Sequence, residues 1–268
     1  MSKQGLYCCF LLTFLLPSSL NSWASSPCEK NISVLYGPYI TENVINLRLR
    51  PVHNEIERLT GCKIEHHISA NYVLFHKKIV RKDFDIILVA SAHLPYIKPL
   101  QYKRAASGLG PIKVTIFGKK DKGIFNLEDL ISKRILLNGD TSIAGLAWED
   151  ITENRIDAAQ VQMLYSVNTD SLLLNLLKGK AEAAITFNQF YERLPNPLKS
   201  KLSILEDRTI ALPASIMVKV SLNQAVQNSI ASAFINDQHW TAQAPHSELT
   251  ITPSTHKKLK AIYSPIKY

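Results

Sequence analysis

Two adjacent hydroxyl residues, Thr141 and Ser142, are the side chains best placed to bind a small anion. They follow a predicted strand at 134–138 and open a predicted helix that begins at Ser142. A helix N-terminus offers unpaired backbone N–H groups and the positive end of a dipole, and hydroxyls there can donate to an oxyanion. The alternative is that Ser142 or Asp140 simply caps its own helix. The two roles are compatible, so the sequence predicts either or both at this turn.

A second candidate loop follows the first predicted strand, at 32–36. Gly37, Pro38 and Tyr39 end that strand, and the topology of an α/β sheet would bring them to the edge where the other strand-to-helix loops lie. Tight-turn chemistry alone would also explain Gly37 and Pro38. We expect these three residues to help form a ligand-binding cleft.

Motifs typical of catalysis or of bound metal are not found in the sequence. It has no nucleophile elbow, glycine-rich phosphate loop, HExxH or CxxC pattern. His66 and His67 are adjacent on a predicted strand and point to opposite faces, so they do not readily share an ion with His76. We therefore expect no catalytic residues, no metal site and no cofactor.

The elements that position these residues alternate between short β-rich runs and segments of helical spacing, which is typical of sheets flanked by helices. The clearest helix begins near Pro51 and ends at the stop signal Gly61. The predicted strands are 32–36, 63–68, 84–89, 113–118, 134–138, 160–164, 183–186 and 215–220. The other predicted helices are 72–80, 127–131, one from 142, 170–177, 222–235 and a short final one.

Two breaks divide this pattern, at 108–111 and at 211–213. They predict an α/β protein with two Rossmann-like lobes joined by two crossover segments. Lobe 1 would comprise residues 25–110 and 213–268, and lobe 2 residues 111–212. Such an arrangement leaves a cleft between the lobes, lined by strand-to-helix loops.

The N-terminal residues 1–24 read as a secretory signal peptide that ends in the small-x-small pattern Ser22-Trp23-Ala24. An uncleaved membrane anchor is the alternative. Removal of this segment leaves two cysteines, Cys28 and Cys62, and an exported protein with two thiols favours a disulfide over two separately buried thiols. In the chain-entropy model, closing that loop would stabilise the fold by roughly 3 to 4 kcal/mol.

The composition is that of an ordinary globular protein, with 46% hydrophobic and 20% charged residues and a formal net charge of +9. Lysine and arginine are scattered and rarely exceed pairs such as Lys77-Lys78. No nucleic-acid-binding motif is present in the sequence. The charge therefore indicates solvation and a mild preference for anions, and not a nucleic-acid partner.

Five motifs occur in order: Gly61, the run 84–89 with His93 after it, and the segments 126–130, 140–145 and 176–184. In this order and spacing they resemble those of the phosphate/phosphonate-type periplasmic solute-binding proteins of ABC transporters. The resemblance implies a type II periplasmic-binding fold whose lobes close on a small ligand by hinge motion. It also implies delivery of that ligand to a membrane permease.

The resemblance adds four candidate ligand-binding residues: Tyr72, Ser91, His93 and Asp170. Tyr72 would supply a stacking face and a donor, or would only pack. A protonated His93 would make anion binding pH-dependent near ~6.5, whereas a neutral one would donate to an oxygen or cap a turn. Asp170 would meet a ligand ammonium or simply stabilise a helix start.

We expect a monomeric binding protein of the periplasm, and not an enzyme, that captures a phosphonate- or phosphate-like ligand or another oxyanion or zwitterion for ABC-type uptake. The alternative is a periplasmic receptor that reports its ligand to a membrane sensor kinase or cyclase. An enzyme on the same fold is a further alternative, against which the export signal speaks. Neighbouring genes for a permease or for a signalling protein would separate the first two.

Overall fold

Two β-sheets organise the chain, one in each of two lobes. The computed structural model describes residues 30–152, 155–166, 169, 171–210, 214–243 and 252–264. The predicted signal peptide, Cys28 and Asp170 lie outside these residues. In this part of the chain, no helix is long and apolar enough to cross a membrane.

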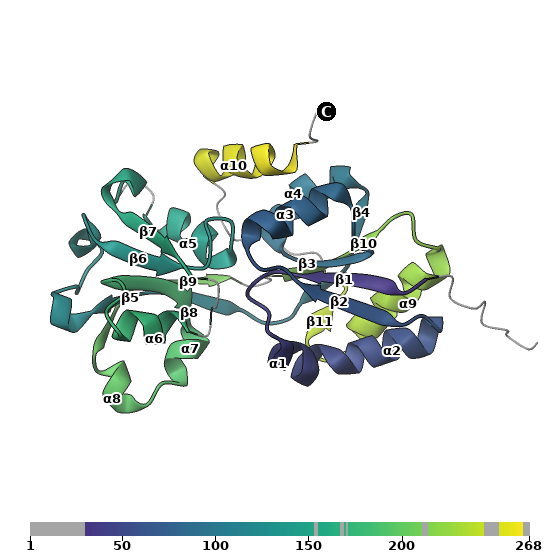
Figure 1. Cartoon of the computed structure of the whole chain (residues 1–268), viewed down its shortest axis with the longest axis horizontal. Coiled ribbons are helices and arrows are strands. Elements are labelled where there is room, and N and C mark those ends of the chain that lie inside the picture. The colour runs from purple at the N-terminus through teal and green to yellow at the C-terminus, as the bar shows by residue number, and fades with distance from the viewer. Residues whose placement is uncertain are drawn as a thin grey trace, which may run out of the picture.

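Lobe 1 is built on a mixed six-stranded sheet in which β1 and its two neighbours are parallel and β10 is antiparallel to β3 and β4. In spatial order its strands are β11 (Trp240–Thr241), β4 (Tyr102–Gly108), β10 (Ala214–Lys219), β3 (Ile86–Ala90), β1 (Ile32–Tyr36) and β2 (Ile64–Ile68). The parallel strands end at the edge that faces the other lobe, so the loops after β1, β2 and β3 meet there (Figure 1).

Lobe 2 is built on a five-stranded sheet in which β6 is parallel to β7 and β8, and β5 is antiparallel to β8 and β9. In spatial order its strands are β7 (Gln162–Tyr165), β6 (Arg134–Leu137), β8 (Ala183–Phe187), β5 (Ile112–Lys119) and β9 (Leu202–Ile210). The chain enters this lobe through residues 109–111, between β4 and β5. The predicted lobe limits stay predictions, since residues 211–213 are outside the described part.

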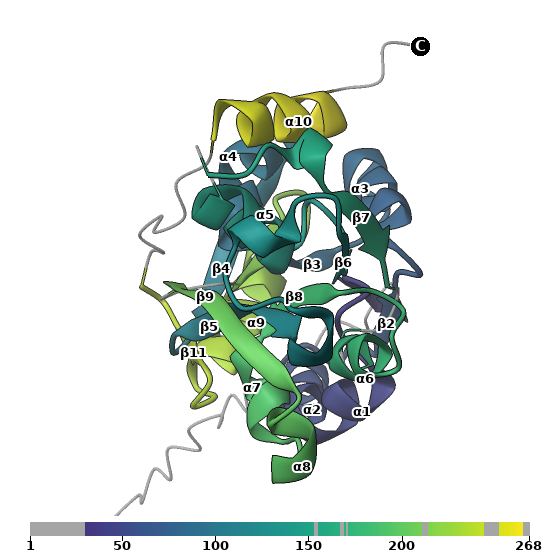
Figure 2. The ribbon, with the colours of Figure 1, turned by 90° about the vertical axis from the view of Figure 1, so that its left-hand side faces the viewer.

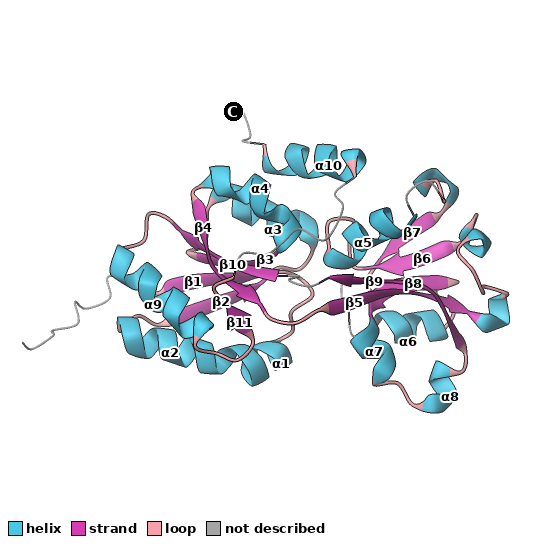
Figure 3. Ribbon diagram, turned by 180° about the vertical axis from the view of Figure 1, so that it is seen from behind, coloured by secondary structure: helices cyan, strands magenta, loops and turns pink. Residues whose placement is uncertain are grey.

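Helices cover both faces of each sheet, as Figure 3 shows from behind. On lobe 1 they are α1 (Glu42–Val44), α2 (Arg50–Thr60), α3 (Tyr72–Arg81), α4 (Leu94–Ile97) and α9 (Gln224–Ile235). On lobe 2 they are α5 (Ile143–Thr152), α6 (Leu172–Leu177), α7 (Asn188–Glu192) and α8 (Asn196–Lys199). A π-helical turn, Ile45–Leu49, joins α1 to α2.

The alternation of side chains along each strand sorts the core into layers. In β1, Val34 and Tyr36 are buried with α2 and α9, whereas Leu35 is buried with α3 on the opposite face. In β6, Leu136 packs with α6, while its two neighbours pack with α5. The layer that contains α3 and α5 is continuous from one lobe to the other, so apolar burial also holds the lobes together.

Several elements differ from those that the sequence predicts. Residues 127–131 were predicted to be a helix but form only one 3-10 turn, Glu128–Leu130, because the backbone leaves the helical region at Ile131, with ψ 129°, and at Ser132, with φ 62°. The π turn before α2 and strand β9 were not predicted. Gly61 ends α2 as predicted, with a positive φ of 70°.

The last helix, α10 (Pro253–Tyr263), lies across both lobes. Figures 1 and 2 show it over α5 on one side and over α3 and α4 on the other. Near its start, Thr252 Oγ1 donates to Glu149 Oε2 of lobe 2 at 3.1 Å. On lobe 1, the hydroxyl of Tyr96 and Nδ1 of His256 are 2.6 Å apart. α10 therefore spans the junction between the lobes.

Candidate functional site

A cavity of about 660 Å³ lies between the lobes beneath α10. Its walls come from α3 of lobe 1, from the β6–α5 loop and the end of β7 in lobe 2, and from α10. The lining residues are Asn71, Tyr72, Val73, His76, Lys77, Val80, Asn138, Gly139, Asp140, Thr141, Tyr165, Lys258 and Ile262. Carbon atoms make up most of the lining surface, and the volume of the cavity is within the range of small-molecule sites.

Tyr72 stands at the first position of α3, where the cap residue Asn71 fixes the helix start by accepting from the N–H of Leu74 at 2.9 Å. The Tyr72 side chain lies against Gly139 and near the side chain of Ser142 in lobe 2, and its ring stacks on Tyr39 with the centroids 6.4 Å apart. Burial raises the pKa of both phenols, so they stay neutral. Tyr72 therefore joins the two lobes.

The turn that meets Tyr72 depends on two glycines and on the hydroxyl of Ser142. Ser142 donates to the carbonyl of Gly139 at 2.6 Å and accepts from the N–H of Gly145 at 2.9 Å, so it caps α5. Gly139 has φ +151°, and a Cβ there would lie 2.8 Å from Cδ2 of Tyr72. At Gly145 a Cβ would lie 2.4 Å from the carbonyl of Gly139. Larger residues at either glycine would force the loop out of place.

Four hydrogen bonds close a buried ring that links lobe 1, lobe 2 and α10. Oγ1 of Thr141 and Nε2 of His76 are 2.7 Å apart, and Nδ1 of His76 lies 2.8 Å from the hydroxyl of Tyr263. The same hydroxyl lies 2.7 Å from Nδ1 of His93, and Nε2 of His93 lies 2.9 Å from the carbonyl oxygen of Thr141. All four residues are buried.

The chemistry of this ring fixes where its protons lie. A carbonyl oxygen only accepts, so Nε2 of His93 carries a hydrogen and its Nδ1 accepts from Tyr263 in the neutral imidazole. The hydroxyl of Tyr263 then accepts from Nδ1–H of His76, whose Nε2 accepts from Thr141. Burial lowers the pKa of His76 to about 3 and that of His93 to about 4, so both are neutral near pH 7. Neither histidine is thus a ready cation for an anionic ligand.

Charges at the other side of the cavity are paired through α10. The ammonium of Lys258 lies 3.1 Å from Oε1 of Glu149 and 3.4 Å from Oδ2 of Asp140. Asp140 also accepts a hydrogen bond from the hydroxyl of Tyr165. Partial burial opposes the charge of Lys258, but the two carboxylates outweigh it and raise the pKa of this ammonium. The described partners of Lys258 thus neutralise it.

The residues predicted from sequence to bind a ligand lie in different parts of the structure. Tyr72 and Thr141 line the cavity, and Tyr39 and Ser142 contact Tyr72. Gly37 and Pro38 are buried in the turn after β1, and Ser91 and Ser215 have their hydroxyls 3.1 Å apart at the β3–β10 pair. His93 belongs to the buried ring, and Asp170 lies outside the described residues. The structure thus brings five of these residues together: Tyr39, Tyr72, His93, Thr141 and Ser142.

Other residues of the site were not predicted as ligand-binding. Lys77 and Val80 extend the α3 wall, Tyr165 comes from β7, and Lys258 and Ile262 come from α10. The helical spacing of Val73, Lys77 and Val80 was visible in the sequence. No pattern in the chain indicated that α10 would fold over the cleft.

Of the two cysteines predicted to form a disulfide, the structure describes Cys62. Cys62 is buried at 6% exposure and is disulfide-bonded. Cys28 lies outside the described residues, so the pairing of Cys28 with Cys62 stays a prediction.

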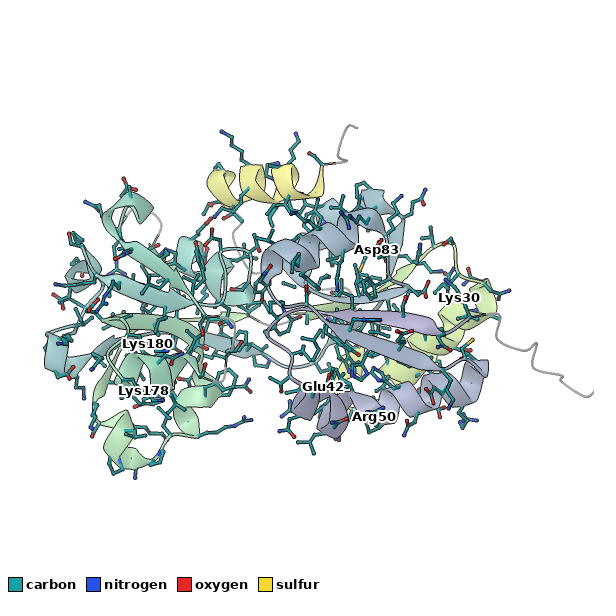
Figure 4. The ribbon with its side chains drawn as sticks, viewed as in Figure 1. Lys30, Glu42, Arg50, Asp83, Lys178 and Lys180 are labelled. Carbon is teal, nitrogen blue, oxygen red and sulfur yellow. The ribbon has the colours of Figure 1, made fainter. Side chains whose placement is uncertain are left out.

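Charged side chains away from the cavity are spread over the surface. Figure 4 shows Glu42 and Arg50 on the α1–α2 side of lobe 1 and Lys178 beside α6 of lobe 2, on the opposite side of the molecule from α10. Among the described residues, no group of three or more His, Cys, Asp or Glu side chains is arranged to hold a metal ion.

Comparison with known families decides what kind of protein this is. Residues 34–256 match the family described as the periplasmic substrate-binding protein of phosphonate ABC transporters. The chain belongs to this family. No curated protein sequence matches the chain. The family predicted from the sequence motifs is thereby confirmed, and its members are periplasmic binding proteins.

Solved structures share the fold of this phosphonate-type binding protein at low sequence identity. PhnD1 of Prochlorococcus marinus, in complex with methylphosphonate, superposes with a TM-score of 0.67 at 14% identity, covering 87% of this chain and 90% of the other. A phosphonate-transporter binding component from Pseudomonas aeruginosa gives 0.62 at 13% identity, covering 87% and 79%. An ancestral arginine-binding protein bound to arginine gives 0.54 at 14%, covering 87% and 97%. These likenesses confirm the predicted two-lobed α/β fold.

Proposed function

We propose that this protein captures a small organic anion in the cavity between its lobes and delivers it to an ABC permease. The observation that carries the proposal is the cavity itself, whose walls come from both lobes and from α10. A ligand in it contacts α3 and the β6–α5 loop at once, so its binding energy favours the closed arrangement of the lobes. Membership of the phosphonate-transporter family supports the same role.

The anionic character of the ligand rests on the charges of the lining. Two lysines, Lys77 and Lys258, and one carboxylate, Asp140, line the cavity. Lys258 is shared by two carboxylates, whereas Lys77 forms no ion pair with any residue that the structure describes. Lys77 is therefore the lining cation that is available to pair with an anion.

Binding is tested by thermal unfolding of the exported protein with phosphate, phosphite, methylphosphonate, larger organic phosphonates and sulfonates, nitrate and amino acids. A ligand at 100 times its dissociation constant should stabilise the fold by about 2.7 kcal/mol. Tyr72→Ala should abolish the shift, and Ser200→Ala, on the exposed end of α8, should preserve it. Absence of any shift across the panel, at millimolar concentration, would contradict the proposal.

Export to the periplasm and delivery to a permease are parts of the same proposal. Mature protein recovered from the periplasm should begin near Ser25. The liganded protein should stimulate ATP hydrolysis by a reconstituted permease, and stimulation of a membrane sensor instead would favour the receptor role.

A further inference from the structure

The hydroxyl groups around the cavity already have partners within the protein. The Thr141 hydroxyl donates to His76, that of Ser142 donates to the carbonyl of Gly139, and that of Tyr165 donates to Asp140. A small tetrahedral oxyanion needs several donors to replace its hydration shell. Binding one here through these hydroxyls would require their internal bonds to break.

Besides these hydroxyls, the lining has two amides, Asn71 and Asn138, and the charged groups of Lys77, Asp140 and Lys258, and much of what remains is apolar. Val73, Val80 and Ile262 contribute side chains with no polar atom, and His76 has both ring nitrogens engaged in the buried ring. An oxyanion the size of phosphate would occupy a small part of about 660 Å³ and leave water against carbon in the remainder. The cavity is therefore better matched to a ligand that covers these walls with carbon of its own.

One charge is available to hold an acid group. Lys77 lines the cavity but is exposed, which places its ammonium at the rim of the wall formed by α3. It is separated by one helical turn from Val73, and Val80 follows three residues later on the same side of α3. An acid group at Lys77 thus leaves an attached apolar body beside these two residues and Ile262 of α10.

We infer that the ligand is an organic acid with an alkyl or aryl body, whose acid group pairs with Lys77 while the body is buried beneath α10. This inference rests on the proposed binding function and specifies its substrate class. The shared chemistry is a single anionic group on an apolar body. Carboxylate, sulfonate and phosphonate groups all satisfy it.

Isothermal titration calorimetry of the exported protein tests the inference with a matched series. Hexylphosphonate, hexanesulfonate and hexanoate vary the acid group, methylphosphonate and inorganic phosphate lack the body, and hexylamine and hexanol lack the negative charge. The hexyl anions should bind at least tenfold more tightly than methylphosphonate or phosphate, and at least tenfold more tightly than cationic hexylamine or uncharged hexanol. The best of the three acids identifies the head group.

Two variants locate the parts of the ligand. Lys77→Gln should weaken binding of the best hexyl acid about tenfold, and Lys78→Gln, whose ammonium lies over the ring of Phe84 and not at the cavity, should leave it unchanged. Val73→Ser, at a position that is 64% exposed and so spares the fold, should reduce the advantage of hexyl over methyl. Unchanged binding in Lys77→Gln would overturn the role of this lysine.

The outcomes separate the inference from the proposed function. Phosphate or methylphosphonate binding as tightly as the hexyl acids would overturn the substrate class and leave the binding function standing. Hexanol or hexylamine binding as tightly would overturn the acid anchor. No binding by any anion would overturn both the inference and the proposed function.

Discussion

His76 and His93 stack with ring centroids 5.3 Å apart and planes 15° from parallel, although they come from different elements of lobe 1. Each bonds the hydroxyl of Tyr263 through Nδ1 and Thr141 of lobe 2 through Nε2. Two histidines thus join both lobes and α10 without carrying charge.

Acid should destabilise the protein. Burial lowers the pKa values of His76 and His93 to about 3 and 4, below the ordinary 6.5, so their neutral forms contribute stability that is complete above pH 6.5 and declines as the pH falls toward 4. At pH 5 one such histidine costs about 2 kcal/mol. Thermal unfolding between pH 7.5 and 4.5 measures the slope of the melting temperature against pH.

The slope should flatten in His93→Gln and stay as in the wild type in His239→Gln, which alters an exposed histidine. His53, also buried with a pKa lowered to about 4, contributes to the same dependence, so the comparison is between slopes and not between single melting temperatures. The buried ring can take up one proton if its hydrogen bonds reverse direction. Neither histidine contacts a described carboxylate that would stabilise the added positive charge. Burial of charge therefore opposes protonation, and a slope unchanged in His93→Gln would contradict this account.

Removing the central hydroxyl should loosen α10. Tyr263→Phe leaves Nδ1 of both histidines without their partner, and a buried polar group without a partner costs about 1–3 kcal/mol. The matched control is Tyr191→Phe, which removes the hydroxyl from a ring stacked on Phe117 in lobe 2. Chemical denaturation should show a loss only for Tyr263→Phe, and equal stability of the two variants would refute the ring's contribution.

Gly139→Ala should weaken ligand binding at least tenfold. The new Cβ would lie 2.8 Å from Cδ2 of Tyr72, and the backbone φ of +151° is one that side chains rarely adopt. Gly110→Ala is the control for strain alone, because Gly110 has φ +85° but no atom within 4 Å of a Cβ. If calorimetry gives the same affinity for both variants, the contact with Tyr72 is not what matters.

Lys258→Met should loosen the contact of α10 with lobe 2 with little effect on global stability. The lost pairs with Asp140 and Glu149 are partly exposed, and such pairs contribute about 1 kcal/mol or less. Hydrogen exchange should accelerate in α10 and not in α3, and exposed Lys257→Met should behave as the wild type. Unaltered exchange in α10 would show that the other contacts suffice to hold it.

Reduction should destabilise the protein by roughly 3 to 4 kcal/mol if Cys28 is the partner of Cys62. Mass spectrometry of peptides cleaved without reduction should find the two cysteines linked. A linkage of Cys62 to any other cysteine would show the predicted pairing to be wrong.

The sequence by itself determined the fold and much of the β6–α5 loop, which is the lobe 2 side of the site. Local signals are strong there: Gly61 at a positive φ ends α2, and Ser142 caps α5 directly after a buried strand. Helical and strand periodicity depend on near neighbours in the chain, so they can be read without the structure. Helix-start chemistry identified Thr141 and the family resemblance identified Tyr72, and both residues line the cavity.

Only the tertiary structure decided how those residues are used. The roles of His76, His93 and Tyr263 depend on α10 meeting two lobes, between residues up to 187 positions apart. Such contacts depend on which apolar faces are buried together, and no local spacing encodes that choice. For the same reason the hydroxyls of Thr141 and Ser142, which were expected to face a ligand, bond His76 and the carbonyl of Gly139, while Lys77 lines the cavity without a described ion-pair partner.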